Sequence, residues 1–182
     1  MKNRYNDAGN IVNRNVMFDN CVLMYLFYPI ATEENRRQKK FLSYSEIFKR
    51  LLLNKNTKII NLFTVSEFVN AALRYELKKY NIENQEYKEF KEFRNSSEGI
   101  QKTNVVYDVV KTEILPEFEL FTTKQYSKKE IENFLYQDRL DFNDKIIADL
   151  CKPLNCVLFT DDYDFSDVEI DILTANKKLL NR

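Results

Sequence analysis

Short apolar segments alternate along this chain with longer segments in which apolar residues recur at helical spacing. The apolar segments have the length and composition of buried strands, and they lie at residues 16–18, 58–62, 119–122, 156–160 and 168–173. Strands that alternate with helices form a parallel sheet, because parallel neighbours need a crossover connection. The sequence therefore predicts an α/β fold of three layers (α/β/α) with a central, mostly parallel sheet.

One domain is expected to span residues 1–182, because a chain of this length can bury a substantial core. Residues 1–13 are polar and predict a flexible arm. Residues 75–118 are charged, have helical periodicity and are interrupted at residues 95–99. This pattern predicts two helices that form a helical insert or cap. A further helix is expected over residues 127–140.

Composition excludes several classes of active site. The chain has no histidine, so Ser-His-Asp catalysis, Cys-His catalysis and His-ligated zinc are absent. Its two glycines, Gly9 and Gly99, are far apart and cannot build a glycine-rich phosphate loop. Basic and acidic residues number 28 each, which gives no overall attraction to nucleic acid but does not exclude a local basic face.

The cysteines, Cys21, Cys151 and Cys156, are odd in number and form no C-x-x-C pair. Their apolar neighbours predict buried, reduced thiols. No signal peptide is evident, and the longest apolar run, residues 21–30, is too short to span a bilayer. We therefore expect a soluble, cytoplasmic protein that has no membrane partner.

Asp19 is a lone acidic residue between the apolar segments Val16–Phe18 and Cys21–Phe27. Carboxylates are rarely buried unless they are paired or bind a cation. The junction of a strand and a helix is also the position of an N-cap residue. In a parallel sheet the same junction is where ligands bind, so both interpretations can hold.

Three acidic residues, Asp161, Asp162 and Asp164, follow the predicted strand at residues 156–160. Asp is a common turn residue, so a solvated acidic turn explains them. A cluster of carboxylates at the end of a strand is equally typical of a cation site. This segment alone does not separate the two interpretations.

Two other acidic positions begin predicted helices, where capping boxes explain them: T-x-x-E at residues 64–67 and D-x-x-D at residues 141–144. The same pattern occurs at residues 127–130, where nothing else suggests chemistry. Capping alone therefore does not identify an active site. Glu67 gains interest because it again follows a strand.

The carboxyl ends of parallel strands share one edge of a sheet, so we expect Asp19, Glu67 and Asp162 to lie near one another. Asp144 joins them if the chain folds back, and Asp141 shares a helical face with Asp144. Carboxylate oxygens without histidine match the ligand preference of Mg²⁺ or Mn²⁺. Such a site can activate water for phosphodiester hydrolysis.

A basic helix face lies upstream of these acids. It consists of Arg36, Arg37, Lys39 and Lys40, within a segment of helical periodicity over residues 33–53. A basic face is usually only solvated, but it is also a candidate contact for the phosphates of nucleic acid.

Four motifs, in this order, resemble those of PIN-domain nucleases, the fold of VapC-type toxins and of several RNA-processing enzymes. They are Phe18-Asp19-Asn20-Cys21-Val22-Leu23 (D-x-N-x-L), Ser66-Glu67-Phe68-Val69-Asn70, Asp144-Lys145-Ile146-Ile147-Ala148 (D-x-x-I-A) and Thr160-Asp161-Asp162-Tyr163-Asp164-Phe165 (T-x-D-x-D-F). Together they frame nearly the whole chain, and their order and spacing make the set more specific than any single motif.

The resemblance implies a metal-dependent endoribonuclease. Its Mg²⁺ or Mn²⁺ ligands would be Asp19, Glu67, Asp144 and Asp162. Asp164 would be an auxiliary acid, and Thr160 would support the site by hydrogen bonding. Whether Asp141 or Asp161 joins the metal ligands stays open, since cap and turn roles explain them.

Partners also follow from the resemblance: RNA as substrate, an antitoxin-like protein and a second copy of the chain in a homodimer. Two features depart from the family pattern. Cys21 stands where the family has Asn, and the stretch at residues 75–118 makes this chain longer than a minimal toxin.

Three alternatives share parts of this evidence. A PIN-like RNA- or protein-binding module that has lost catalysis would suit the Cys21 departure and the long insert. A flap-type DNA nuclease would use the same acidic pocket. A receiver-like phosphoacceptor domain also gathers Asp residues at strand ends, but it needs a Lys near the last strand, and residues 168–173 contain none.

Overall fold

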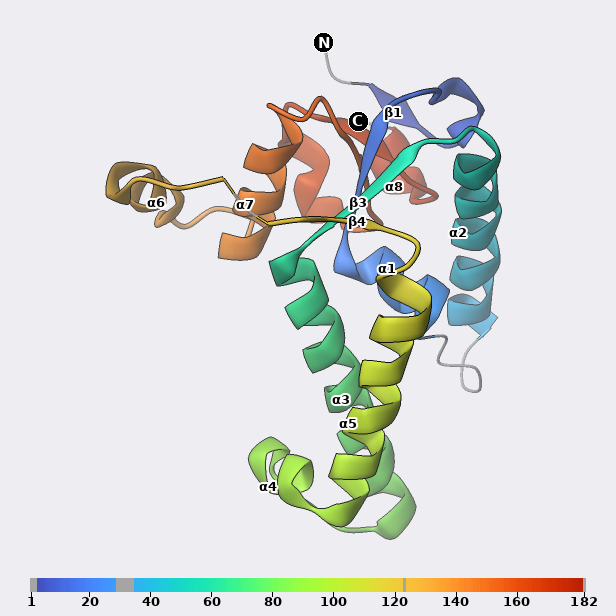
Figure 1. The fold of residues 1–182 in the computed structure, drawn as a ribbon, viewed down its shortest axis with the longest axis vertical. Coiled ribbons are helices and arrows are strands. Elements are labelled where there is room, and N and C mark those ends of the chain that lie inside the picture. Colours follow the sequence, from blue (N-terminus) through green and yellow to red (C-terminus); the bar gives the residue numbers. More distant parts are fainter. Residues whose placement is uncertain (1–2, 29–34, 123, 182) are drawn as a thin grey trace.

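The computed structural model describes residues 3–28, 35–122 and 124–181 (Figure 1). Its centre is a six-stranded sheet in the order β1-β6-β5-β2-β3-β4, and every neighbouring pair is parallel. The strands are β1 (Arg4–Tyr5), β2 (Asn15–Phe18), β3 (Thr57–Asn61), β4 (Glu119–Phe121), β5 (Val157–Phe159) and β6 (Asp171–Leu173). The predicted parallel sheet is confirmed, and β1 is a strand that the sequence did not predict.

Helices cover both faces of the sheet, which confirms the three-layer α/β/α prediction. They are α1 (Asn20–Phe27), α2 (Asn35–Leu53), α3 (Leu62–Asn84), α4 (Phe90–Asn95), α5 (Ser97–Val109), α6 (Lys128–Phe134), α7 (Phe142–Cys151) and α8 (Lys177–Leu180). Shorter turns are the 3₁₀ helices η1 (Ala8–Asn10) and η3 (Tyr163–Asp167) and the π-helical turn η2 (Val110–Ile114), which continues α5.

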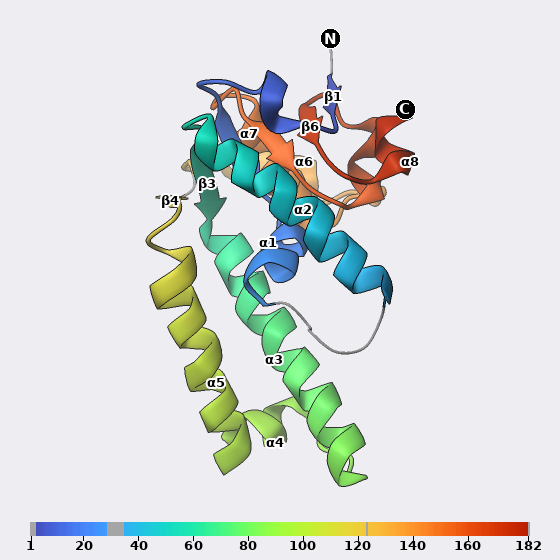
Figure 2. The same ribbon diagram turned by 90° about the vertical axis from the view of Figure 1, so that its right-hand side faces the viewer.

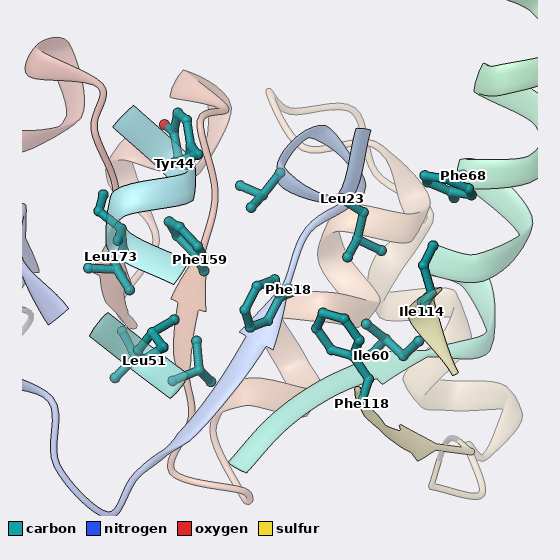
Figure 3. Packing of buried hydrophobic residues seen from close by; sticks show 14 of the residues in the cluster. Phe18, Leu23, Tyr44, Leu51, Ile60, Phe68, Ile114, Phe118, Phe159 and Leu173 are labelled. Carbon is teal, nitrogen blue, oxygen red and sulfur yellow. The ribbon is translucent and has the colours of Figure 1, made fainter. Parts of the chain in front are cut away.

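Successive side chains of the central strands point to opposite faces of the sheet, and both faces are apolar. Met17 and Leu158 pack in one buried cluster with α7 and α8. Phe18 and Phe159 pack in the other cluster, with α1, α2, α3 and η2. Figure 3 shows Phe18 among its neighbours, and its ring meets those of Phe159 and Phe118 edge-on at centroid distances of 5.2 and 4.8 Å.

Helices α3 and α5 lie side by side and project away from the sheet, with α4 at their far end (Figures 1 and 2). The stretch at residues 75–118 is helical as predicted, but in place of two helices it contains the outer part of α3 together with α4, α5 and η2. On the inner side of this projection Glu76 accepts a hydrogen bond from Tyr28 at 2.6 Å and pairs with Lys102 at 3.2 Å.

The described part of the predicted flexible arm is instead integrated into the fold. Arg4–Tyr5 pairs with β6, and Arg4 donates to the carbonyl oxygen of Ile170 at 2.7 Å. Ala8 and Ile11 are buried in the core. The polar composition of this segment gave no sign that Ala8 and Ile11 would be buried, because they are covered only when the segment folds back over the sheet.

The helix predicted over residues 127–140 is shorter than expected, because α6 ends at Phe134. Lys145 of α7 is buried and its ammonium group donates to the carbonyl oxygens of Phe134 and Tyr136, while it pairs with Asp138 at 3.2 Å. A buried ammonium needs such partners. These contacts hold residues 135–141 as a loop against α7.

The described residues bear on two features of the sequence, its apolar runs and its cysteines. Among their helices, none is both long enough and apolar enough to cross a membrane. All three cysteines are unpaired, and Cys151 and Cys156 are buried as predicted. Cys21 is only partly buried.

Candidate functional site

Asp19 directly follows β2 and is 6% exposed. Its backbone occupies the N-cap position of α1, as predicted, but its side chain makes no capping hydrogen bond, so capping does not account for the carboxylate. The carboxylate instead accepts hydrogen bonds from the hydroxyl of Thr160 at 2.5 Å and from the thiol of Cys21 at 3.0 Å. Burial raises the pKa of Asp19, and these hydrogen bonds oppose that shift only in part.

Thr160 connects Asp19 with the acidic turn after β5. Its hydroxyl oxygen accepts a hydrogen bond from the backbone N–H of Asp162 at 2.9 Å while it donates to Asp19. Asp162 in turn accepts from the N–H of Asp164 at 2.9 Å, which begins η3. The predicted support by Thr160 is therefore present as hydrogen bonds, whereas Asp164 is exposed at the rim.

Glu67 lies within α3, and its position is not explained by capping. The helix begins at Leu62, where Asn61 caps it by accepting from the N–H of Thr64 at 2.9 Å. The capping box predicted at residues 64–67 is therefore wrong. The Glu67 carboxylate accepts a hydrogen bond from the amide of Asn143 on α7.

Asn143 is the residue of this site that sequence reasoning missed. A single polar residue in the first turn of a helix is ordinary, so nothing in its own pattern marks it. The available signal was its place between Asp141 and Asp144 in a helix expected to face other acids. Its hydrogen bond to Glu67 joins the side chains of α7 and α3, which otherwise pack in different core clusters.

Asp141 and Asp144 form the predicted capping box at the start of α7. Asp141 accepts from the N–H of Asp144 at 2.8 Å, and Asp144 accepts from the N–H of Asp141 at 3.3 Å. The pKa of Asp144 is nevertheless raised to about 8, mainly by burial and further by the negative charges of Asp141, Asp19 and Asp162. Capping and clustering thus coexist at this residue.

The predicted acids share one electrostatic environment. Burial raises the pKa of Glu67, and the charges of Asp19 and Asp141 raise it further. The charge of Asp162 likewise contributes to the raised pKa of Asp19. These effects indicate that Asp19 lies within electrostatic range of Glu67, Asp144 and Asp162. That the four acids bind one metal ion stays a prediction.

None of these four acids forms an ion pair with a Lys or Arg within the described ranges. Other largely buried acids elsewhere in the protein do have such partners. They are Asp161 with Lys40, Asp171 with Arg14 and Glu76 with Lys102. The four acids of the candidate site therefore differ from these three in having no basic partner among the described residues.

The donor chemistry of this site fits a hard divalent cation, since all four side chains offer carboxylate oxygens. Among the described residues, however, no group of three or more Cys, Asp and Glu side chains is arranged so that it could hold a metal ion as it stands. Glu67 is held by Asn143 and Asp144 by Asp141. Joint coordination by the four acids therefore requires side-chain movement.

The two lysines of the predicted basic face have different surroundings. Lys40 pairs with Asp161 and is thereby turned toward the end of β5, whereas Lys39 is exposed. The side chains of Arg36 and Arg37 lie outside those that the structure describes. The Lys40 contact places this end of α2 beside the carboxyl edge of the sheet.

Two comparisons with known proteins found no relative of this chain. No protein-family model matches the chain, and no curated protein matches it significantly.

Proposed function

We propose that this protein is a metal-dependent endoribonuclease that resembles PIN-domain nucleases. The observation that supports it most is the group of four carboxylates, Asp19, Glu67, Asp144 and Asp162, gathered without a basic partner among the described residues. Uncompensated, partly buried carboxylates are costly, and a divalent cation would offset that cost. Their order along the chain also follows the motif order of the family.

A divalent ion such as Mg²⁺ or Mn²⁺ bound there would supply Lewis acidity for the attack of water on an RNA phosphodiester. The residues of the chain hold the ligands. Thr160 fixes the Asp19 carboxylate and the backbone of Asp162 relative to each other. Asn143 fixes Glu67 from the opposite helix.

RNA as the substrate of this proposal comes from the family resemblance, and the basic end of α2 suits the phosphate backbone of any nucleic acid. The basic end of α2, with the exposed Lys39, lies beside the acidic edge because Lys40 contacts Asp161. A basic surface next to an acidic metal site is suited to hold a phosphate backbone while one phosphate is hydrolysed. An antitoxin-like partner and a homodimer remain part of the proposal through the family resemblance.

The first test compares wild type with Asp162→Asn and with a control, Asp108→Asn, which removes an exposed carboxylate from α5. Each protein is incubated with labelled single-stranded RNA, structured RNA and single-stranded DNA in Mn²⁺, Mg²⁺ or EDTA. We expect cleavage of RNA that needs metal, is unchanged in Asp108→Asn and falls at least about 100-fold in Asp162→Asn.

Each other outcome has a clear meaning. Preference for DNA would replace the ribonuclease with a flap-type nuclease. Absence of cleavage under all conditions, with tight RNA or protein binding by folded wild type, would favour a binding module. The binding module is the second candidate because, among the described residues, no three acids are arranged to hold a metal ion as they stand.

A further inference from the structure

Asp161 is adjacent to the proposed metal ligand Asp162, yet its side chain points to a different set of partners. Its carboxylate accepts hydrogen bonds from the hydroxyls of Tyr25 at 2.9 Å and Tyr44 at 2.6 Å. It also forms an ion pair with Lys40 of α2. Lys40 compensates the charge of this acid and the two hydroxyls stabilise it by hydrogen bonding, whereas the four acids of the candidate site have no basic partner among the described residues.

These contacts are largely removed from water. The side chains of Asp161 and Lys40 are 13% and 25% exposed, and Tyr44 is fully buried. Buried ion pairs with additional hydrogen bonds impose a defined geometry, because the loss of one partner leaves an uncompensated charge. The position of Asp161 is therefore strongly constrained by α2.

The backbone of Asp161 transmits that constraint to the candidate site. Its N–H donates to the sulfur of Cys21 at 3.2 Å, and Cys21 donates to the carboxylate of Asp19. Its carbonyl oxygen accepts from the side chain of Asn176 at 2.7 Å. On either side of it, Thr160 and Asp162 carry the hydrogen bonds that join Asp19 to the acidic turn.

We propose that Asp161 is a positioning residue for the metal site, and that Lys40 serves to hold Asp161 rather than to bind RNA. Asp161, anchored by Lys40 and Tyr44, fixes the turn so that Thr160 faces Asp19 and Asp162 faces the other acids. Cys21 belongs to this support, in the position where the resembled family has Asn. The inference depends on the proposed metal site and adds a residue that the motif resemblance leaves open.

The test measures Mn²⁺ affinity without RNA, by electron paramagnetic resonance of free Mn²⁺ during a titration. The variants are Asp161→Asn and Lys40→Met. We expect both to bind Mn²⁺ about 10-fold to 100-fold more weakly than wild type, as is typical when groups that orient metal ligands are removed. Circular dichroism and thermal unfolding establish that each variant is folded at the temperature of the titration.

Two matched controls separate positioning from general stability and from RNA binding. Asp171→Asn breaks the Arg14–Asp171 pair, which lies at the amino ends of the strands, away from the candidate site. The side chains of this pair are 24% and 16% exposed. It should lower stability and leave Mn²⁺ affinity unchanged. Lys39→Met removes the exposed neighbour of Lys40 and should weaken RNA binding only.

The results distinguish this inference from the proposed function. Unchanged Mn²⁺ affinity in folded Lys40→Met, or an equal loss in Asp171→Asn, would overturn the positioning role. Metal binding by wild type without RNA cleavage would refute the nuclease, while the affinities of the variants would still decide the role of Asp161. Absence of Mn²⁺ binding by wild type would overturn both. If Asp161→Asn does not fold, Lys40→Met supplies the decisive comparison.

Discussion

At the scale of single residues, the candidate site is unfavourable for the stability of the metal-free fold. Asp144 shows this most clearly, because burial and three neighbouring carboxylates raise its pKa to about 8. Residues gathered for function commonly cost stability that other parts of the fold must offset. The substitution of such a residue should therefore stabilise the protein and inactivate it.

We predict that Asp144→Asn raises the melting temperature in EDTA at about pH 8.5, by roughly 2–4 °C for each 1 kcal/mol gained. The Asn side chain can still accept from the N–H of Asp141, so the cap is kept. When folding raises the pKa of an acid, the protein becomes less stable as the pH rises from the pKa of the unfolded state, about 3.9, to the pKa of the folded state. The advantage of the variant should accordingly shrink toward about pH 4.5.

Differential scanning calorimetry across this pH range checks that prediction, with Asp108→Asn as the control for loss of one exposed carboxylate. An Asp144→Asn protein that is less stable than wild type at about pH 8.5 would show that the electrostatic cost is absent. The same variant should lack metal-dependent cleavage, because it has lost a proposed ligand.

At the scale of elements, the helical projection depends on a close contact between α4 and α5. Ser96 caps α5 by accepting from the N–H of Gly99 at 3.1 Å, and its hydroxyl donates to the carbonyl oxygen of Phe93 at 2.7 Å. A Cβ atom on Gly99 would lie 1.8 Å from that carbonyl oxygen. Gly99 is therefore required by the approach of two backbones, and it ends the charged stretch at the break seen in the sequence.

We predict that Gly99→Ala destabilises the projection by about 2 kcal/mol or more, because the backbone of α4 must move. Hydrogen exchange should show faster opening of α4 and the adjoining turn of α5, with the sheet still protected. Ser97→Ala, at an exposed position in the same turn, is the control. Equal exchange in both variants would contradict the assigned role of Gly99. Mn²⁺ affinity should not change, since the acids lie at the other end of α3.

At the scale of the whole molecule, the N-terminal segment completes the sheet and one of its helical layers. It adds β1 at one edge, and Arg4 donates to the carbonyl oxygens of Ile170 and Ser166 near β6. Ile11 is fully buried, and Asn56 donates to its carbonyl oxygen at 2.8 Å. This segment is therefore part of the cooperative core.

We predict that Ile11→Ala lowers the free energy of unfolding by about 2–4 kcal/mol, as expected for loss of a buried branched side chain. Val12→Ala, beside it and 55% exposed, should change stability by less than about 0.5 kcal/mol. Urea unfolding monitored by circular dichroism measures both. If the two variants are equally stable, the segment is not part of the core.

Sequence patterns predicted five of the six strands of the sheet and most of the helices. The apolar segments at residues 16–18 and 156–160 became β2 and β5, and the D-x-x-D pattern at residues 141–144 became a capping box. These features depend on side-chain periodicity and on backbone groups a few residues apart. Such interactions are local, so a sequence pattern contains them.

Which polar side chains contact each other depends on the tertiary structure. Asp161 and Asp162 are consecutive acids in one turn, and only the packing of Lys40 and Tyr44 against the first separates their surroundings. The side chains of Asn143 and Glu67 are 76 residues apart in the sequence, and they meet because α7 and α3 lie on opposite faces of one sheet and both reach its carboxyl edge. Contacts between residues distant in the chain depend on the docking of whole helices, which periodicity does not specify.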